Sequence, residues 1–176
     1  MRKHDLTALH LAAQNDKVEC MKELLAHKNI NIAARENNGL TPLHIAAMKG
    51  SVKSVNVLLS YKYTDVNITT DTGITPLHCA AFSGHSECVR LLLAHHSINS
   101  NAQITGDDDK GYTPLHYAAK NGHTNCVQLL LRHNGIQVNI KDEKGKTPLK
   151  TARNSWHNYS SRQEIIELLI KYGATE

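Results

Sequence analysis

Histidine and cysteine are the residues of this 176-residue chain that could do chemistry, since both side chains bind metals and act in catalysis. The chain has 12 histidines and 4 cysteines but no C-x-x-C pair. Cys20, Cys88 and Cys126 each stand 13 residues after the first residue of a recurring Thr-x-Leu-His motif. Copies of one position in stacked repeats lie about 10 Å apart, too far to share one tetrahedral ion. We therefore expect no metal ligands, and we expect all four cysteines to be reduced and buried as small apolar side chains.

The motif recurs five times along the chain. It begins at Thr7 as Thr-Ala-Leu-His, at Thr41, Thr75 and Thr113 as Thr-Pro-Leu-His, and at Thr147 as Thr-Pro-Leu-Lys. The spacings between these threonines are 34, 34, 38 and 34 residues. A period of this length is typical of repeat proteins, in which each repeat is one supersecondary unit.

Each repeat predicts two helices separated by a turn. Threonine followed by proline is typical of a helix N-cap and first turn, and Leu-His-x-Ala-Ala continues that helix. A glycine ends it in the three middle repeats, and apolar residues at helical spacing then predict a second, longer helix. The first helices are expected near residues 8–15, 42–49, 76–83, 114–121 and 148–155, and the second helices near 18–27, 52–61, 86–95, 124–133 and 162–172.

The strings at residues 75–85 and 113–123, both Thr-Pro-Leu-His-x-Ala-Ala-x-x-Gly-His, resemble the ankyrin repeat. The resemblance covers essentially the whole chain and implies an all-α solenoid of stacked helix pairs joined by hairpin loops. It implies a single domain, residues 1–176, with repeats at about 1–36, 37–70, 71–108, 109–142 and 143–176. It also implies that the motif histidines, at positions 10, 44, 78 and 116, bond the cap threonine and nearby backbone and tie one repeat to the next.

Composition and motifs argue against other classes of function. The net charge is +4 and the basic residues are dispersed, which does not indicate a nucleic-acid partner. The sequence has no phosphate-binding loop, dinucleotide fingerprint or nucleophile elbow, so we expect no catalytic residue and no cofactor. It has no run of about 18 apolar residues that would span a membrane, and we expect no secretory leader. We expect a monomer in the cytoplasm or nucleus, where thiols stay reduced.

Ankyrin repeats generally hold protein partners with the hairpin tips and the inner helix face, so positions that vary between repeats are expected to bind the partner. These are chiefly the residue before each motif threonine and the residue seven after it. In repeats 2 to 4 they place apolar residues side by side, and exposed apolar rows usually mark interaction sites. The predicted partner-binding residues are Leu40, Met48, Ile74, Phe82, Asp109, Tyr112, Lys120, Lys144, Lys146 and Trp156.

Two insertions interrupt the regular spacing. Four extra residues fall within residues 103–107, just before an acidic run, in the junction ahead of the fourth motif. We expect a protruding acidic finger beside Tyr112, opposite a lysine-rich tip in the next hairpin, with a loop of no role as the alternative. The second insertion lies at residues 153–163, where Trp156 either caps the core or anchors a partner.

The sequence therefore predicts a non-catalytic scaffold that binds a partner protein of unknown identity through its hairpin tips and inner helix face. The alternative is a regulatory or targeting segment of a larger multidomain enzyme or channel, because ankyrin arrays are often joined to other domains. The two hypotheses overlap, since both use the array to bind a protein.

Overall fold

The computed structural model describes residues 6–106, 108–155 and 159–176. Over these residues the regular structure consists of ten helices, without a strand. The helices form five pairs: α1 (Ala8–Gln14) with α2 (Val18–Leu25), α3 (Pro42–Lys49) with α4 (Val52–Ser60), α5 (Pro76–Ser83) with α6 (Ser86–Leu93), α7 (Pro114–Lys120) with α8 (Thr124–Arg132), and α9 (Pro148–Arg153) with α10 (Tyr159–Lys171). The all-α fold class is therefore confirmed.

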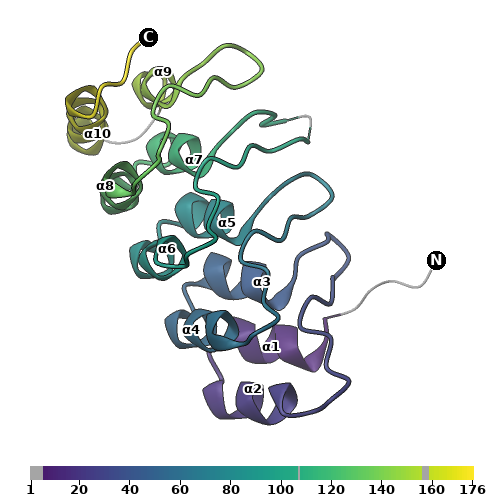
Figure 1. Ribbon diagram of the computed structural model, residues 1–176. Coiled ribbons are helices and arrows are strands. Elements are labelled where there is room, and N and C mark those ends of the chain that lie inside the picture. Colours follow the sequence, from purple (N-terminus) through teal and green to yellow (C-terminus); the bar gives the residue numbers. More distant parts are fainter. Residues whose placement is uncertain (1–5, 107, 156–158) are drawn as a thin grey trace.

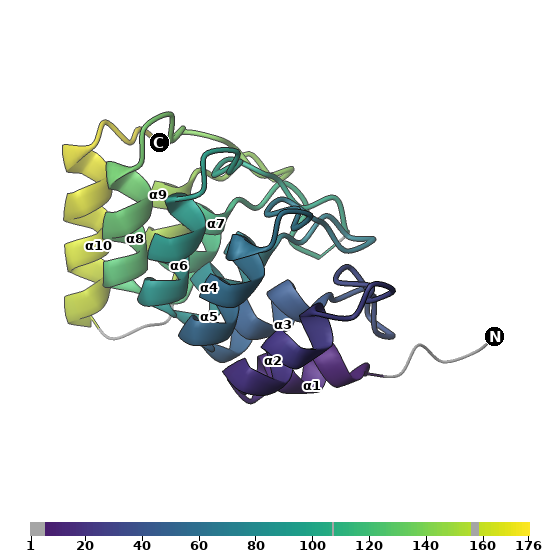
Figure 2. The same cartoon turned by 60° about the horizontal axis from the view of Figure 1, so that its bottom comes forward.

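The pairs stack so that helices of one kind form a row. Figure 1 shows the inner row of α1, α3, α5, α7 and α9 between the hairpin loops and the outer row of even-numbered helices. Figure 2 shows the same rows from another direction, with the hairpins extending away from both. Each helix contacts its own partner and the equivalent helices of adjacent pairs. This is the predicted solenoid.

A threonine starts each inner helix and a histidine three residues later links it to the next hairpin. In α7, Thr113 Oγ1 accepts the N–H of His116, and the backbone N–H of Thr113 donates to His116 Nδ1 at 3.2 Å. Because Nδ1 accepts, the proton lies on Nε2, which donates to the Lys146 carbonyl 3.0 Å away. The implied role of the motif histidine, to tie one repeat to the next, is seen directly in these bonds.

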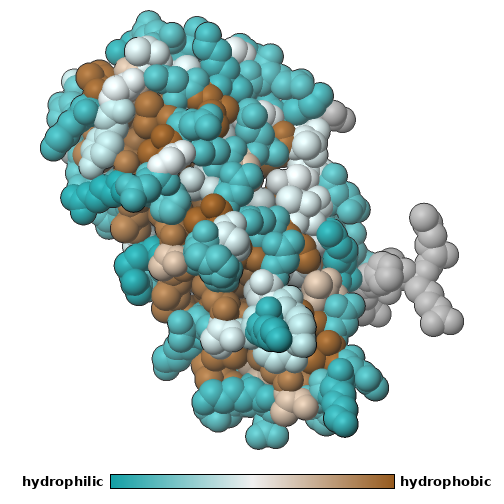
Figure 3. All heavy atoms as spheres, in the orientation of Figure 1, coloured by the Kyte–Doolittle hydropathy of each residue, from teal (hydrophilic) through white to brown (hydrophobic). Residues whose placement is uncertain are grey.

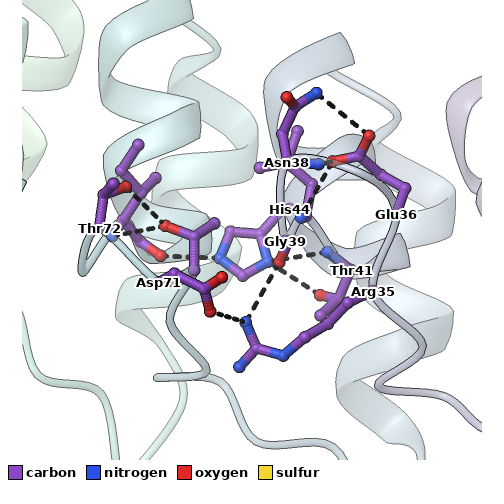
Figure 4. A network of polar contacts seen from close by, with 11 residues as sticks. Arg35, Glu36, Asn38, Gly39, Thr41, His44, Asp71 and Thr72 are labelled. Atoms are coloured by element: carbon purple, nitrogen blue, oxygen red, sulfur yellow. Dashed lines mark hydrogen bonds and ion pairs between the residues drawn. The ribbon is translucent and has the colours of Figure 1, made fainter. Parts of the chain in front are cut away.

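The other three motif histidines make the same link, from His10 to the carbonyl of Leu40, from His44 to that of Ile74, and from His78 to that of Tyr112. Figure 4 shows His44 between its cap threonine and the next hairpin. Burial lowers the pKa of both His44 and His78 to about 4, because desolvation disfavours the imidazolium. The neutral ring is also the form that this bonding pattern requires.

A glycine and a histidine fit together in the two joints between repeats 2, 3 and 4. Gly84 ends α5 with a φ of +77°, and a Cβ there would lie 2.6 Å from the ring of His123. That ring in turn donates from Nε2 to the Phe82 carbonyl at 3.0 Å. Gly50 and His85 are arranged in the same way. Glycine is required here both for its left-handed backbone and for the space that the histidine fills.

The joint between the first two repeats is built from different residues. Asp16 replaces the glycine and keeps a left-handed backbone, with a φ of +52°. Its Oδ1 accepts the backbone N–H of Ser54 at 2.7 Å and the Ser54 hydroxyl at 2.8 Å. Ser51 replaces the histidine, and its hydroxyl donates to the Gln14 carbonyl at 3.2 Å. A small side chain opposite Asp16 leaves room for its Cβ.

Three cysteines lie in the core as expected, but the expectation is wrong for Cys20, which is exposed. Cys88 of the preceding repeat lies close enough to Cys126 to add to the rise in the pKa of Cys126 that burial causes, so this position faces the preceding helix pair. No described helix pair precedes α1 and α2, and Cys20 is left uncovered. All four thiols are free.

The helices begin and end within about two residues of their predicted positions, except at α10. The prediction began that helix near residue 162, whereas it begins at Tyr159. The residues from Tyr159 onward in the second insertion therefore lengthen the last helix. The buried Ile165 and Leu169 anchor that helix to the core.

Candidate functional site

Three of the four hairpin tips are closed by a polar side chain. In the first, the Glu36 N–H donates to the Leu40 carbonyl at 3.0 Å, and the Leu40 N–H donates back to Glu36 Oε1 at 3.1 Å. The same two bonds join Thr70 with Ile74 and Asp142 with Lys146. Figure 4 shows the bonds that Glu36 makes in its tip. These tips are fixed by local hydrogen bonds and keep the side chains of neighbouring residues in place.

Ion pairs join neighbouring tips. Arg35 NH1 lies 3.6 Å from Asp71 Oδ1 of the next hairpin, as Figure 4 shows. Lys110 Nζ lies 2.6 Å from Glu143 Oε1, which joins the long hairpin to the one that follows. The sequence predicted acidic residues on the long hairpin opposite lysines on the next. That prediction is wrong for this pair, in which the lysine and the acid have exchanged hairpins.

The long hairpin is closed by an apolar contact instead of a polar side chain. Ile104 takes the closing position, with its N–H donating to the Tyr112 carbonyl at 3.0 Å. Its side chain is 4% exposed and packs with Tyr112 and Tyr117, while the backbone N–H groups of Thr105 and Gly106 donate to the Thr72 carbonyl of the preceding hairpin. The expected protruding finger is therefore docked along its described length, because burying Ile104 and Tyr112 draws it onto the stack.

Asp109, near the end of the long hairpin, turns toward the inner helix row. Its carboxylate accepts the Tyr117 hydroxyl at 2.9 Å and the Lys120 ammonium at 2.9 Å. Burial raises the pKa of Tyr117 well above its usual range, and the bond to Asp109 raises it further, so the phenol stays protonated and donates. Lys120 Nζ also lies 4.9 Å from the centre of the Tyr112 ring, within range of a cation–π contact.

Phe82 carries the largest exposed apolar side chain of the inner helix row, at 53% exposed. Its ring meets the Tyr117 ring edge-on, with the centroids 5.3 Å apart. The carbonyl of Phe82 also accepts the Asn121 side-chain N–H at 3.0 Å, which fixes the neighbouring helix end. Figure 3 shows hydrophobic residues reaching the surface in several areas between hydrophilic ones.

A pocket of about 430 Å³ opens between the fourth and fifth repeats. Its charged lining residues are three lysines and one acid: Lys120, Lys144, Lys146 and Asp109. The rest of its lining is polar or aromatic: Tyr112, Asn121, Thr151, Asn154 and Ser155. Since Asn121 also bonds the Phe82 backbone, the pocket adjoins the exposed aromatic ring.

The expected row of exposed apolar residues is wrong for four of its five members. Leu40, Met48 and Ile74 are half-buried against the core, and Tyr112 is 8% exposed. The reason is that Leu40, Met48 and Ile74 pack against the core of the stack, while Tyr112 packs with Ile104 and Tyr117. Phe82 alone is exposed as expected, and the partner role of the whole set stays a prediction.

The polar members of the predicted set lie around the pocket. Asp109, Lys120, Lys144 and Lys146 all line it, although Asp109 and Lys120 bond each other. Trp156 lies outside the described residues. The structure thus brings together four charged residues that the sequence placed on three separate segments.

Several residues in and around the pocket were not predicted as site residues, and two of them carried a signal in the sequence. Tyr117 and Thr151 stand four residues after their motif threonines, where the other repeats have Leu11, Ile45 and Cys79. A phenol and a hydroxyl at an otherwise apolar position were the signal in the sequence.

Among the described residues, no group of three histidine, cysteine or acidic side chains lies close enough to hold a metal ion. In the same part of the chain, no helix is both long and apolar enough to cross a membrane.

A family model described as ankyrin repeats (3 copies) matches residues 1–70, 38–104, 64–142 and 100–175, in overlapping stretches. No curated protein matches the chain. The match follows the helix pairs described above from one end of the stack to the other.

Proposed function

Because the chain belongs to the ankyrin-repeat family, whose members generally mediate protein–protein interaction, we propose that it is a non-catalytic scaffold that binds a partner protein. The partner lies across the inner helix row and the hairpin tips, with Phe82 at the centre of the contact. The exposed ring of Phe82 is the observation that carries this proposal. The Phe82 carbonyl accepts bonds from Asn121 and His123, which fix its backbone, and its large aromatic side chain is 53% exposed, as is typical of an interface anchor.

The stack supports a single binding unit without catalysis. Its four motif histidines are translated copies that bond backbone carbonyls, so their ring nitrogens are already occupied. A catalytic site needs a nucleophile, base and orienting group in one place, and these copies serve instead to join repeats. The chain acts as one domain and as a monomer, and the four free thiols favour a reducing location such as the cytoplasm or nucleus.

An affinity pull-down from the source cell tests the proposal with Phe82→Ala as the variant. Phe82 is exposed, so the variant should keep its fold, which circular dichroism and thermal unfolding would check. We expect the recovered partner to fall about tenfold or more, as for an interface anchor. The matched control is Tyr63→Ala, which removes an aromatic ring that is 73% exposed and lies outside the inner row. Equal recovery with both variants would exclude Phe82 as the anchor.

A further inference from the structure

The pocket between the fourth and fifth repeats carries a net positive charge. Three lysines face one aspartate, and the ion pair between Lys120 and Asp109 leaves Lys144 and Lys146 to set the local charge. Asp142 lies behind the tip, but it is buried and its Oδ1 already accepts the Lys146 N–H at 2.6 Å. The mouth of the pocket therefore favours an anionic group.

A buried hydroxyl in the wall of the pocket has unused bonding capacity. Thr151 is 5% exposed, and its Oγ1 makes no hydrogen bond. Burial raises the pKa of the neighbouring Tyr112 phenol, and the Thr151 hydroxyl opposes that rise, so the two groups are close without the geometry of a bond. An unpartnered buried polar group is rare and destabilising. Because the Thr151 oxygen has almost no accessible surface, a ligand would accept its proton after a small shift of the pocket wall, and that bond would relieve the cost.

The edge of the pocket also shows which anion it can hold. Asp109 seats a carboxylate between the Tyr117 hydroxyl and the Lys120 ammonium, with both bonds at 2.9 Å. The same kinds of group, lysines and a hydroxyl, also line the rest of the pocket in Lys144, Lys146 and Thr151. The intramolecular contact thus provides an example of the recognition chemistry.

We propose that this pocket binds a carboxylate side chain from an acidic segment of the partner protein, while an adjacent apolar side chain of that segment packs on Phe82. The inference rests on the proposed function and adds the chemical class of the partner. The distance between the two contacts is short, because Asn121 belongs to the pocket and bonds the Phe82 carbonyl.

A protein segment fits this surface better than a nucleic acid. Asp108 on the long hairpin and Glu143 on the next hairpin are exposed and would repel a continuous phosphate backbone. Nucleic-acid sites usually present a broad basic face, whereas the basic residues of this chain are dispersed and only Lys120, Lys144 and Lys146 meet in the pocket. An acidic segment with an adjacent apolar side chain matches both the charge of the pocket and the exposed ring beside it.

The proposal is tested by titrating the ¹⁵N-labelled chain with the synthetic peptide Gly-Phe-Glu-Asp-Glu-Gly and following amide chemical shifts. We expect the largest changes at residues 120–121, 144–146 and 151–155, with binding that weakens as salt is raised. The matched peptide Gly-Phe-Gln-Asn-Gln-Gly should bind at least about tenfold more weakly, since it lacks the charge. Equal binding of the two peptides, or shifts centred elsewhere, would overturn the proposal.

Variants distinguish binding in the pocket from nonspecific electrostatic attraction to a basic protein. The double variant Lys144→Gln with Lys146→Gln should weaken binding of the acidic peptide about tenfold, whereas Lys28→Gln with Lys171→Gln removes the same charge from distant exposed sites and should change it less than about twofold. Thr151→Val keeps the side-chain shape and removes the unbonded hydroxyl, so it should weaken binding about threefold without lowering thermal stability. If both double variants weakened peptide binding equally, binding would not depend on the pocket lysines and the proposal would fail.

A phosphoserine version of the peptide distinguishes the two anionic chemistries. Tighter binding of that peptide than of the carboxylate peptide would overturn the proposal in favour of phosphate recognition. Failure of every peptide, together with loss of the cellular partner in Phe82→Ala, would overturn this inference alone and leave the proposed function standing.

Discussion

The joint between repeats 1 and 2 differs from the joints between repeats 2, 3 and 4, although all connect the same kind of helix pair. In the central joints a glycine with a left-handed backbone makes room for a histidine ring, as Gly84 does for His123. In the first joint Asp16 and Ser51 take these two places, and Asp16 instead binds Ser54. The replacements occur together because each permits the other.

The first repeat and the central repeats also differ in how well their apolar side chains are covered. Central residues such as Leu92 are fully buried between neighbours, whereas Leu11 is 47% exposed and Cys20 lines an open apolar hollow of about 590 Å³. Stability in a repeat stack is roughly a sum over repeats and their interfaces, so the first repeat should be the least stable part. One sequence motif can therefore yield repeats of very different stability, depending on whether a neighbouring repeat covers each side.

Thiol reactivity should show the largest contrast between the two regions. Cys20 is exposed and should react with an aromatic disulfide reagent as fast as a free thiol. Burial raises the pKa of Cys79 to about 12 and that of Cys88 and Cys126 to about 11, so these thiols are both inaccessible and protonated. We expect them to react at least about a thousandfold more slowly, through local opening. Mass spectrometry of the modified peptides would identify each site, and Cys20→Ser should remove the fast phase.

Truncation of a leucine in each region should give the next largest difference. Leu92→Ala creates a cavity at a fully buried position and should lower the free energy of unfolding by about 2–5 kcal/mol. Leu11→Ala removes a side chain that is already half in water and should lower it by less than about 1 kcal/mol. Denaturant titration measures both values, and similar losses would contradict the difference between centre and end.

Acid should destabilise the central repeats through two buried histidines. The pKa of His44 and His78 is about 4 in the folded chain, against about 6.5 when unfolded, because burial disfavours the charged ring. Between these values the unfolded state binds more protons, so the stabilisation is complete above about pH 6.5 and is lost as the pH falls toward about 4. At about pH 5 we expect a loss of about 2 kcal/mol per histidine relative to neutral pH.

Denaturant titrations at the two pH values would measure this loss. His78→Gln should remove part of the pH dependence, whereas His27→Gln with His96→Gln, at two exposed positions, should leave it unchanged. A chain equally stable at both pH values would show that the buried rings do not govern acid unfolding.

The fold could be predicted from the sequence because its signals are local. The Thr-Pro step, the terminal glycine and the apolar spacing each specify a helix boundary within a few residues, and the repeat spacing multiplies the evidence. The predicted burial of Cys20 was wrong because its exposure does not follow from a local signal. Its position in the repeat is buried only when another helix pair precedes it, and that depends on the stack and not on the local sequence.

The candidate site was less predictable because it depends on contacts between segments. Nothing near Ile104 in the sequence shows that it would replace the polar closing residue of a tip and draw Tyr112 inward. The bond from Asp109 to Lys120 likewise joins a loop to the end of a helix across 11 residues. Local patterns identify which positions vary, but the folded hairpin decides which of them stay exposed.

The smallest expected effect, and the most specific to the comparison, is the coupling between Gly84 and His123. Gly84→Ala introduces a Cβ at a φ of +77° and 2.6 Å from the His123 ring, so it should suffer both backbone strain and a clash. Gly145→Ala is the matched control, since its φ is +71° and a Cβ there would meet nothing within 4 Å, so it should show the strain alone, about 1 kcal/mol. His123→Ser reproduces the first joint, where Ser51 stands in this place. Combined with Gly84→Ala it should destabilise by about 1–2 kcal/mol less than the sum of the two single variants, because the serine leaves room for the Cβ. A double-mutant cycle in denaturant measures that difference, and strict additivity would show that the glycine and the histidine do not depend on each other.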